Sequence, residues 1–294
     1  MPEAFFPPSI TAGCMDELDE EDGPELRKDD PKFREACTDL EKFFDEHPKE
    51  LFYDRQLAVL FERKYFHWIT ARALKELATS GRLVTHLEAM SGVRDEGGKA
   101  LMVRFYRHPA HRYWQTQRKE ILTLVGRFSG DFGHSLGYYG ELLCDAGLGG
   151  EGFAKAAKNV REWQGKRWTE TAHNLDRIYV RDGIAYGCEI KNTLKYLPVK
   201  ERDIKLSMCQ HLGLKPLFIV RWLPKNHMYE IIEAGGFAIL FERQLYPIGQ
   251  EALAKEVEER LALPAACVRE FPADAVTRFV RLHVRSVKNG AKVR

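Results

Sequence analysis

The stretch HNLDRIYVRDGIAYGCEIKN, residues 173–192, decides the predicted fold and the candidate chemistry of this chain. Two runs rich in β-branched and aromatic residues flank a turn at 181–183, which predicts a pair of antiparallel strands. Because side chains alternate along a strand, Glu189 and Lys191 share one face with two small residues, whereas the other face is apolar. The sequence therefore predicts a carboxylate and an amine side by side, next to free space.

A second carboxylate, Asp176, lies on the first of these strands, thirteen residues before Glu189. Hairpin pairing is expected to bring the two carboxylates together. Such hard oxygen ligands suit Mg²⁺ or Mn²⁺, and a water bound to such an ion attacks a phosphate more readily. The alternative is a cross-strand salt-bridge cluster on a solvated face.

Asp176, a tight turn and then Glu189-Ile190-Lys191 inside an apolar strand resemble the Asp-(x)n-Glu-x-Lys signature of the PD-(D/E)XK nucleases, the restriction-endonuclease-like superfamily. The resemblance covers roughly 131–245. It implies an α/β fold with a mixed β-sheet core flanked by helices. It also implies a metal-dependent endonuclease that hydrolyses phosphodiester bonds, with DNA as the substrate.

The same resemblance implies roles for individual residues. Lys191 would orient or help deprotonate the attacking water, or neutralise charge on the phosphate, and Gln210 would be an auxiliary residue on the following helix. The implied catalytic residues are Asp176, Glu189, Lys191, Glu141 and Gln210. The implied ligands of Mg²⁺ or Mn²⁺ are Asp176, Glu189, Glu141 and, through its carbonyl, Ile190.

Residues 31–108 show three segments with helical apolar spacing, followed by a hairpin pattern with a charged loop at 92–99. This order, and the stretch YFHWITARALKELATSGRLV in particular, resembles winged helix-turn-helix domains. In such domains the third helix enters the major groove of DNA, and Thr70 is also the expected cap of that helix. The residues expected to lie near the nucleic acid are Thr70, Arg72, Lys75, Glu76 and Arg82.

Residues 1–30 hold ten acidic and two basic side chains and read as a disordered acidic arm, which leaves a net charge of +10 on the remainder. That excess suits a polyanionic partner. The predicted organisation is this arm, a winged-helix domain at 31–108, a connecting helix at 109–130 and a nuclease domain at 131–294. Within the last domain, the expected helices are about 138–146, 151–165, 201–212, 250–262 and 272–286, and the expected strands are 174–181, 184–192, 217–223 and two between 229 and 242.

The composition indicates the cellular location to expect for the protein. No apolar run reaches membrane-spanning length, and six scattered cysteines without a Cys-x-x-Cys pair predict free thiols in the cytoplasm. Pairing into a homodimer, as many nucleases do, is compatible with the sequence. Two alternative functions stay open: a DNA-binding regulator or assembly factor on a nuclease-like scaffold, and a nuclease directed at RNA.

Overall fold

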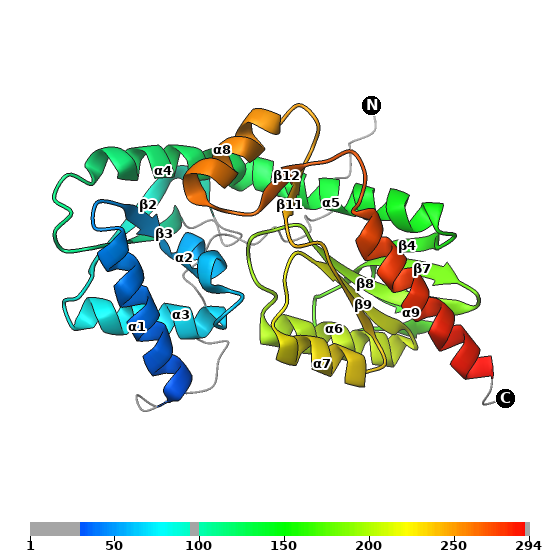
Figure 1. The fold of residues 1–294 in the computed structure, drawn as a ribbon. Coiled ribbons are helices and arrows are strands. Elements are labelled where there is room, and N and C mark those ends of the chain that lie inside the picture. The colour runs from blue at the N-terminus through cyan, green and yellow to red at the C-terminus, as the bar shows by residue number, and fades with distance from the viewer. Residues whose placement is uncertain (1–29, 95–99, 292–294) are drawn as a thin grey trace.

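The computed structural model describes residues 30–94 and 100–291, and its centre is a five-stranded mixed sheet with strand order β10-β9-β8-β7-β4 (Figure 1). β4, β7 and β8 are mutually antiparallel, whereas β8, β9 and β10 run parallel. The strands are β4 (Ala154–Val160), β7 (Leu175–Arg181), β8 (Ile184–Lys191), β9 (Lys215–Val220) and β10 (Phe237–Leu240).

The pair β7–β8 forms where the sequence predicts it. Asp182 and Gly183 both have positive φ, 50° and 71°, as a two-residue hairpin turn of the right twist requires. Arg181 consequently pairs with Ile184, which fixes the register of the whole hairpin.

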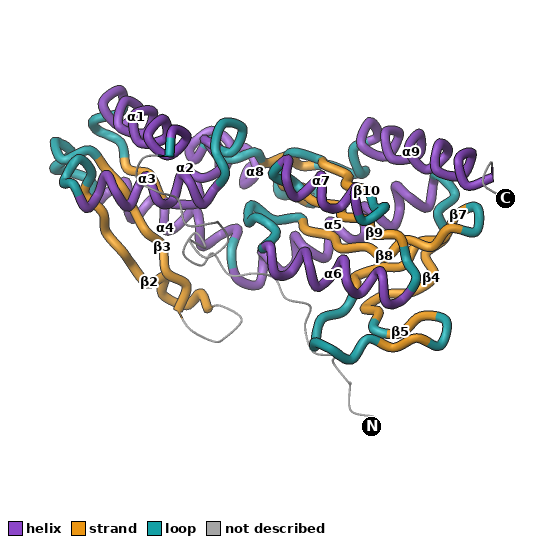
Figure 2. Tube along the Cα trace, turned by 90° about the horizontal axis from the view of Figure 1, so that it is seen from below, coloured by secondary structure: helices purple, strands orange, loops and turns teal. Residues whose placement is uncertain are grey.

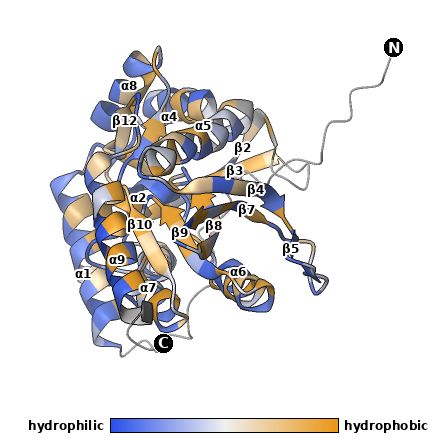
Figure 3. Ribbon diagram, turned by 90° about the vertical axis from the view of Figure 1, so that its right-hand side faces the viewer, coloured by the Kyte–Doolittle hydropathy of each residue, from blue (hydrophilic) through white to orange (hydrophobic). Residues whose placement is uncertain are grey.

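Helices cover both faces of this sheet, and Figure 3 shows α5 above the strands and α6 below them. α5 and α9 pack on the face that presents Tyr186 and Cys188, whereas α6 and α7 cover the opposite face. The arrangement is the mixed α/β architecture that the sequence predicts. The four helices are α5 (Gly130–Gly150), α6 (Val199–Leu212), α7 (Lys225–Glu233) and α9 (Ala273–Ala291).

Two predicted elements are wrong. The helix expected over 151–165 is instead β4 followed by a hairpin of β5 (Glu162–Trp163) and β6 (Lys166–Arg167), because pairing with β7 outweighs the helical propensity of the alanines. The strand expected near 229–234 is α7, which buries Ile231 against the sheet. Short apolar runs fit either period, so the sequence alone did not separate them.

The N-terminal region contains the three predicted helices and the predicted hairpin, with one further short strand. Its sheet has the order β1-β3-β2, and Asp30 caps the first helix by accepting from two backbone N–H groups. Part of the charged loop at 92–99 lies outside the described residues, as does the acidic arm except Asp30. The elements are α1 (Pro31–Glu46), β1 (Leu51–Tyr53), α2 (Asp54–Phe61), α3 (His67–Thr79), β2 (Val84–Arg94) and β3 (Ala100–Arg107).

A late segment of the chain returns to the N-terminal region. The segment consists of β11 (Gln244–Tyr246), α8 (Glu251–Leu261) and β12 (Ala265–Cys267). Figure 1 shows α8 beside α4 (Gln115–Phe128), the predicted connecting helix, and β11 and β12 next to α5. Their buried side chains share one apolar core with the β1-β3-β2 sheet. A boundary after residue 130 therefore cuts through a common core.

A buried ion pair also joins the end of α2 to the end of β9, although the two sheets stand apart in Figure 2. Arg221, just after β9, donates to both carboxylate oxygens of Glu62 at 2.7 Å, and Tyr196 donates to the same carboxylate at 2.8 Å.

No helix in the described ranges is both long and apolar enough to cross a membrane. The five cysteines of those ranges are free thiols.

Candidate functional site

Asp176 and Glu189 face each other across β7 and β8. The register pairs Arg177 with Cys188, so its continuation by one residue sets Asp176 opposite Glu189. Both side chains are buried, with 4% and 3% of their surface exposed. The Oδ2 atom of Asp176 accepts a hydrogen bond of 2.7 Å from the backbone N–H of Ile190. The two predicted carboxylates are therefore brought together.

Two lysines bracket Glu189 on the same face of the sheet. The Nζ atom of Lys191 lies 3.2 Å from one oxygen of Glu189 and 2.9 Å from Glu201 of α6. Lys205, also from α6, contacts the other oxygen of Glu189 and donates to the carbonyl of Asn174. The site is thus a buried cluster of carboxylates and amines rather than a solvated surface ion pair.

The pKa values of the two carboxylates are shifted in opposite directions. Burial, and then the charge of Glu189, raise the pKa of Asp176 well above its usual value. Burial works in the same direction on Glu189, yet the charges of Lys191 and Lys205 lower its pKa. Burial opposes the charge of both amines, but the neighbouring carboxylates raise the pKa of each lysine. Glu189 and the two lysines are consequently charged near neutral pH.

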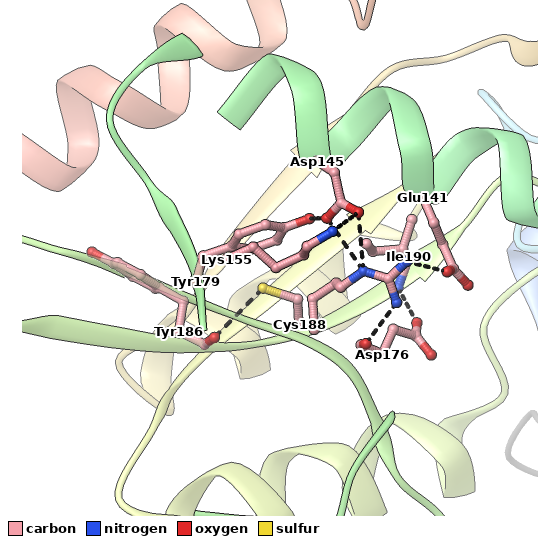
Figure 4. Close-up of polar contacts among 9 residues, drawn as sticks. Glu141, Asp145, Lys155, Asp176, Tyr179, Tyr186, Cys188 and Ile190 are labelled. Carbon is pink, nitrogen blue, oxygen red and sulfur yellow. Dashed lines mark hydrogen bonds and ion pairs between the residues drawn. The ribbon is translucent and has the colours of Figure 1, made fainter. Parts of the chain in front are cut away.

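The structure engages Glu141 elsewhere. Figure 4 shows Glu141 and Asp145 descending from α5 toward the sheet. Arg177 binds both of them, at 2.5 Å and 3.2 Å, and also donates to the backbone carbonyl of Asp176. Tyr179 donates to Asp145 at 2.7 Å. Although Arg177 opposes the shift, burial raises the pKa of Glu141. The third expected metal ligand is therefore held in an ion-pair network on the other face of the sheet.

On α6, Lys205 rather than Gln210 contacts Glu189. Gln210 is exposed, whereas Lys205 is 5% exposed and touches Glu189. The signal in the sequence was a lysine within the buried stripe of the helix, where Met208, Cys209 and Leu212 follow it at helical spacing.

The expected free space beside Glu189 is absent at Gly187. A Cβ atom there would lie 2.8 Å from the Sγ atom of Cys209 and 2.8 Å from a methyl carbon of Leu175. Gly187 therefore lets α6 approach the sheet closely, and the prediction of a vacancy at that position is wrong.

The residues expected to meet nucleic acid are placed unequally. Thr70 is fully buried inside α3, so its predicted roles as helix cap and as a DNA contact are wrong. Arg72 is half-buried and Lys75 is exposed. Arg82 is exposed and forms an ion pair with Glu41. Residues 67–71 of α3 are all buried, and a side chain of the helix is exposed to solvent only from Lys75 onward.

The donor set for a metal is small. Within residues 30–94 and 100–291, no three His, Cys, Asp or Glu side chains are grouped to hold a metal ion. Asp176 and Glu189 remain as a pair, and Mg²⁺ is commonly held by one or two carboxylates while it keeps several waters. Burial, and then the charge of Glu189, raise the pKa of Asp176, and a bound cation would oppose both effects. The pair fits such an ion as a partial ligand set.

Comparisons of the chain with protein-family models, with curated proteins and with solved structures found no match.

Proposed function

We propose that this chain is a divalent-metal-dependent nuclease that hydrolyses phosphodiester bonds, with DNA as its substrate. One observation carries the proposal: Asp176 lies opposite Glu189, and Lys191 and Lys205 stand beside them. Carboxylates that hold a divalent cation, together with amines that meet a phosphate, are the groups this hydrolysis needs.

The order of elements supports the resemblance to PD-(D/E)XK nucleases. A helix, α5, precedes the antiparallel strands β4, β7 and β8, and α6 and the parallel strand β9 follow them. This is the succession of helix, motif-bearing hairpin, helix and strand that the resemblance implies.

Each group has a definable task. Asp176 and Glu189 would hold Mg²⁺ or Mn²⁺, which activates a bound water and offsets charge on the phosphate. Because the pKa of Lys191 and that of Lys205 are raised, both amines stay protonated. They are suited to orient the water or to stabilise the developing negative charge, and unsuited to remove a proton.

The N-terminal region is proposed as a winged-helix module that binds nucleic acid. Its three helices followed by the β2–β3 hairpin support this assignment, and Lys75 on α3 and Arg82 after it are exposed. Such side chains would contact phosphates and fix the register of the protein on DNA.

The direct test replaces Glu189 and Asp176 separately. Glu189→Gln should abolish Mg²⁺- or Mn²⁺-dependent cleavage and the calorimetric signal of metal binding, whereas Glu233→Gln, on the exposed surface of α7, should change neither. Asp176→Asn should also lose both while it stays folded, because its raised pKa makes the neutral side chain a close mimic. Full activity in either folded site variant would refute the proposal.

A second candidate function is a DNA-binding scaffold without catalysis. The specific observation in its favour is that two lysines already neutralise Glu189, and Arg177 occupies Glu141. A scaffold predicts DNA binding without metal uptake and without cleavage of DNA or RNA. Duplex DNA, single-stranded DNA and RNA assayed at one salt concentration would also show which polymer is cut.

A further inference from the structure

A basic hairpin, residues 161–167, emerges beside the candidate site. β4 ends at Val160, which pairs with Leu175, the neighbour of Asp176. The chain therefore leaves the sheet at the end where the two carboxylates lie, forms β5 and β6, and returns to that end through residues 168–174. Figure 3 shows this hairpin projecting from the sheet next to α6.

The hairpin is held in a defined position. Its turn at 164–165 has φ of 47° and 79°, which suits a tight two-residue turn. At its base, Arg161 donates to the backbone carbonyl of Thr171 at 2.9 Å. Further along, the ring of His211 on α6 bonds the carbonyl of Arg167 at 3.0 Å. The hairpin therefore lies along α6 as a fixed arm.

The arm presents positive charge to solvent. Arg161, Lys166 and Arg167 are exposed, and Glu162 is the single acidic residue of the hairpin. Among the described residues, none of these three basic side chains forms an ion pair with a carboxylate. His211 is six residues beyond Lys205, which is roughly 9 Å along the helix axis. One DNA strand carries a charge about every 3.4 Å, so this offset spans two to three phosphates.

The aromatic residues of the arm favour a duplex over a single strand. Proteins that bind single strands offer exposed aromatic rings on which bases stack. Here Trp168 is 2% exposed and Trp163 is half-buried, and both pack with side chains of α6 and β7. What the hairpin leaves exposed is charge, which matches the sugar-phosphate backbone.

We infer that the basic hairpin binds the phosphate backbone of duplex DNA and holds it beside Asp176 and Glu189. The identity of the partner rests on the proposed nuclease function, and the hairpin extends that function to a specific substrate-binding surface. The contact is to backbone, so it positions the duplex without reading its sequence.

The test measures binding of the full chain to a labelled DNA duplex in metal-free buffer from 50 to 200 mM salt. The double variant Lys166→Gln/Arg167→Gln should bind more weakly, with a slope of log affinity against log salt that is shallower by about two. Over this range the parent should therefore lose roughly tenfold more affinity than the variant. The control Arg281→Gln/Arg285→Gln, in exposed positions of α9, should behave as the parent.

Several results would overturn the inference. They are an unchanged affinity and salt slope in the folded hairpin variant, an equal loss in the α9 control, no duplex binding by the parent, or a hairpin-dependent preference for single-stranded DNA or RNA. Binding without metal does not depend on cleavage. Hairpin-dependent binding by a parent that never cleaves would refute the nuclease and leave the binding surface standing.

Discussion

At the scale of single residues, two lysines share one carboxylate but differ in where they come from. Lys191 follows Glu189 on the same strand, whereas Lys205 reaches it from a helix. Both amines are kept protonated by their surroundings, so in the proposed nuclease each would act through its positive charge. Lys191 is more exposed than Lys205, so replacing Lys191 should affect mainly cleavage, whereas replacing Lys205 should affect mainly stability.

We predict that Lys191→Ala keeps the fold and metal binding but lowers cleavage at least 100-fold, on the order expected when one charge-stabilising group is lost. Lys205→Ala should instead cost stability, because Lys205 is 5% exposed and its loss leaves Glu189 with less compensation. The measurements are the rate of metal-dependent cleavage and urea unfolding of both variants. Full cleavage by folded Lys191→Ala would contradict the role assigned to it.

At the scale of elements, the contact between α6 and β8 depends on the absence of a side chain. A Cβ atom added at Gly187 would lie 2.8 Å from side-chain atoms of Cys209 and Leu175, so these side chains or their elements would have to shift. Since the same helix supplies Lys205, the spacing of these two elements also sets the geometry around Glu189.

Gly187→Ala is therefore expected to destabilise the protein by about 1–3 kcal/mol, the usual cost of overpacking a core. Gly137→Ala on α5 is the matched control, because a Cβ atom there meets nothing within 4 Å. In a helix interior that control should gain about 0.5–1 kcal/mol. Chemical denaturation of both variants measures the difference in the free energy of unfolding. Equal effects would mean that the space between α6 and β8 accommodates a methyl group at position 187.

At the scale of the whole molecule, the N-terminal region docks through polar groups on the segments that follow β8 and β9. Glu62 is clamped by Arg221 and Tyr196, and the ring of His67 stacks on Tyr196 with centroids 4.3 Å apart. Tyr196 lies five residues beyond Lys191, so part of the docking surface and part of the candidate site belong to one segment of the chain.

Replacing Arg221 should leave the buried carboxylate of Glu62 without its positively charged partner. We predict that Arg221→Met costs about 3–5 kcal/mol, and that the double variant with Glu62→Leu costs clearly less than the sum of the two single changes. Arg63→Met, which breaks an exposed pair with Glu242, should cost no more than about 1 kcal/mol. Thermal or urea unfolding gives the comparison, and additive effects would argue against the clamp.

The docking surface should also weaken in acid. Burial, and then the charges of Arg55 and His227, lower the pKa of His67 to about 3. The unfolded chain therefore takes up a proton below pH 6.5 that the folded chain resists. Stability is fully present above pH 6.5 and falls as the pH drops toward 3, by about 2 kcal/mol at pH 5.

His67→Phe keeps an aromatic ring against Tyr196 but cannot take up this proton, so it should lose about 2 kcal/mol less than the parent between pH 7 and pH 5. Urea unfolding at the two pH values measures this difference. The exposed His134→Gln is the control and should follow the parent. A parallel loss in His67→Phe and the parent would show that His67 is not the titrating group.

The sequence by itself determined the β7–β8 hairpin and the pairing of Asp176 with Glu189. Strand alternation and a two-residue turn act over a few residues, so local chemistry fixes the register and with it which side chains stand opposite. The same local logic identified the three N-terminal helices and the end of α6 at Gly213, whose φ of 73° suits a glycine.

Only the tertiary structure decided what surrounds that pair. Lys205 meets Glu189, Arg177 captures Glu141, and α6 fills the space over Gly187, each through contacts between elements distant in sequence. Helical periodicity states which residues share a face but not which face meets the sheet. Packing of the whole chain settles that choice, because apolar burial is summed over all elements at once.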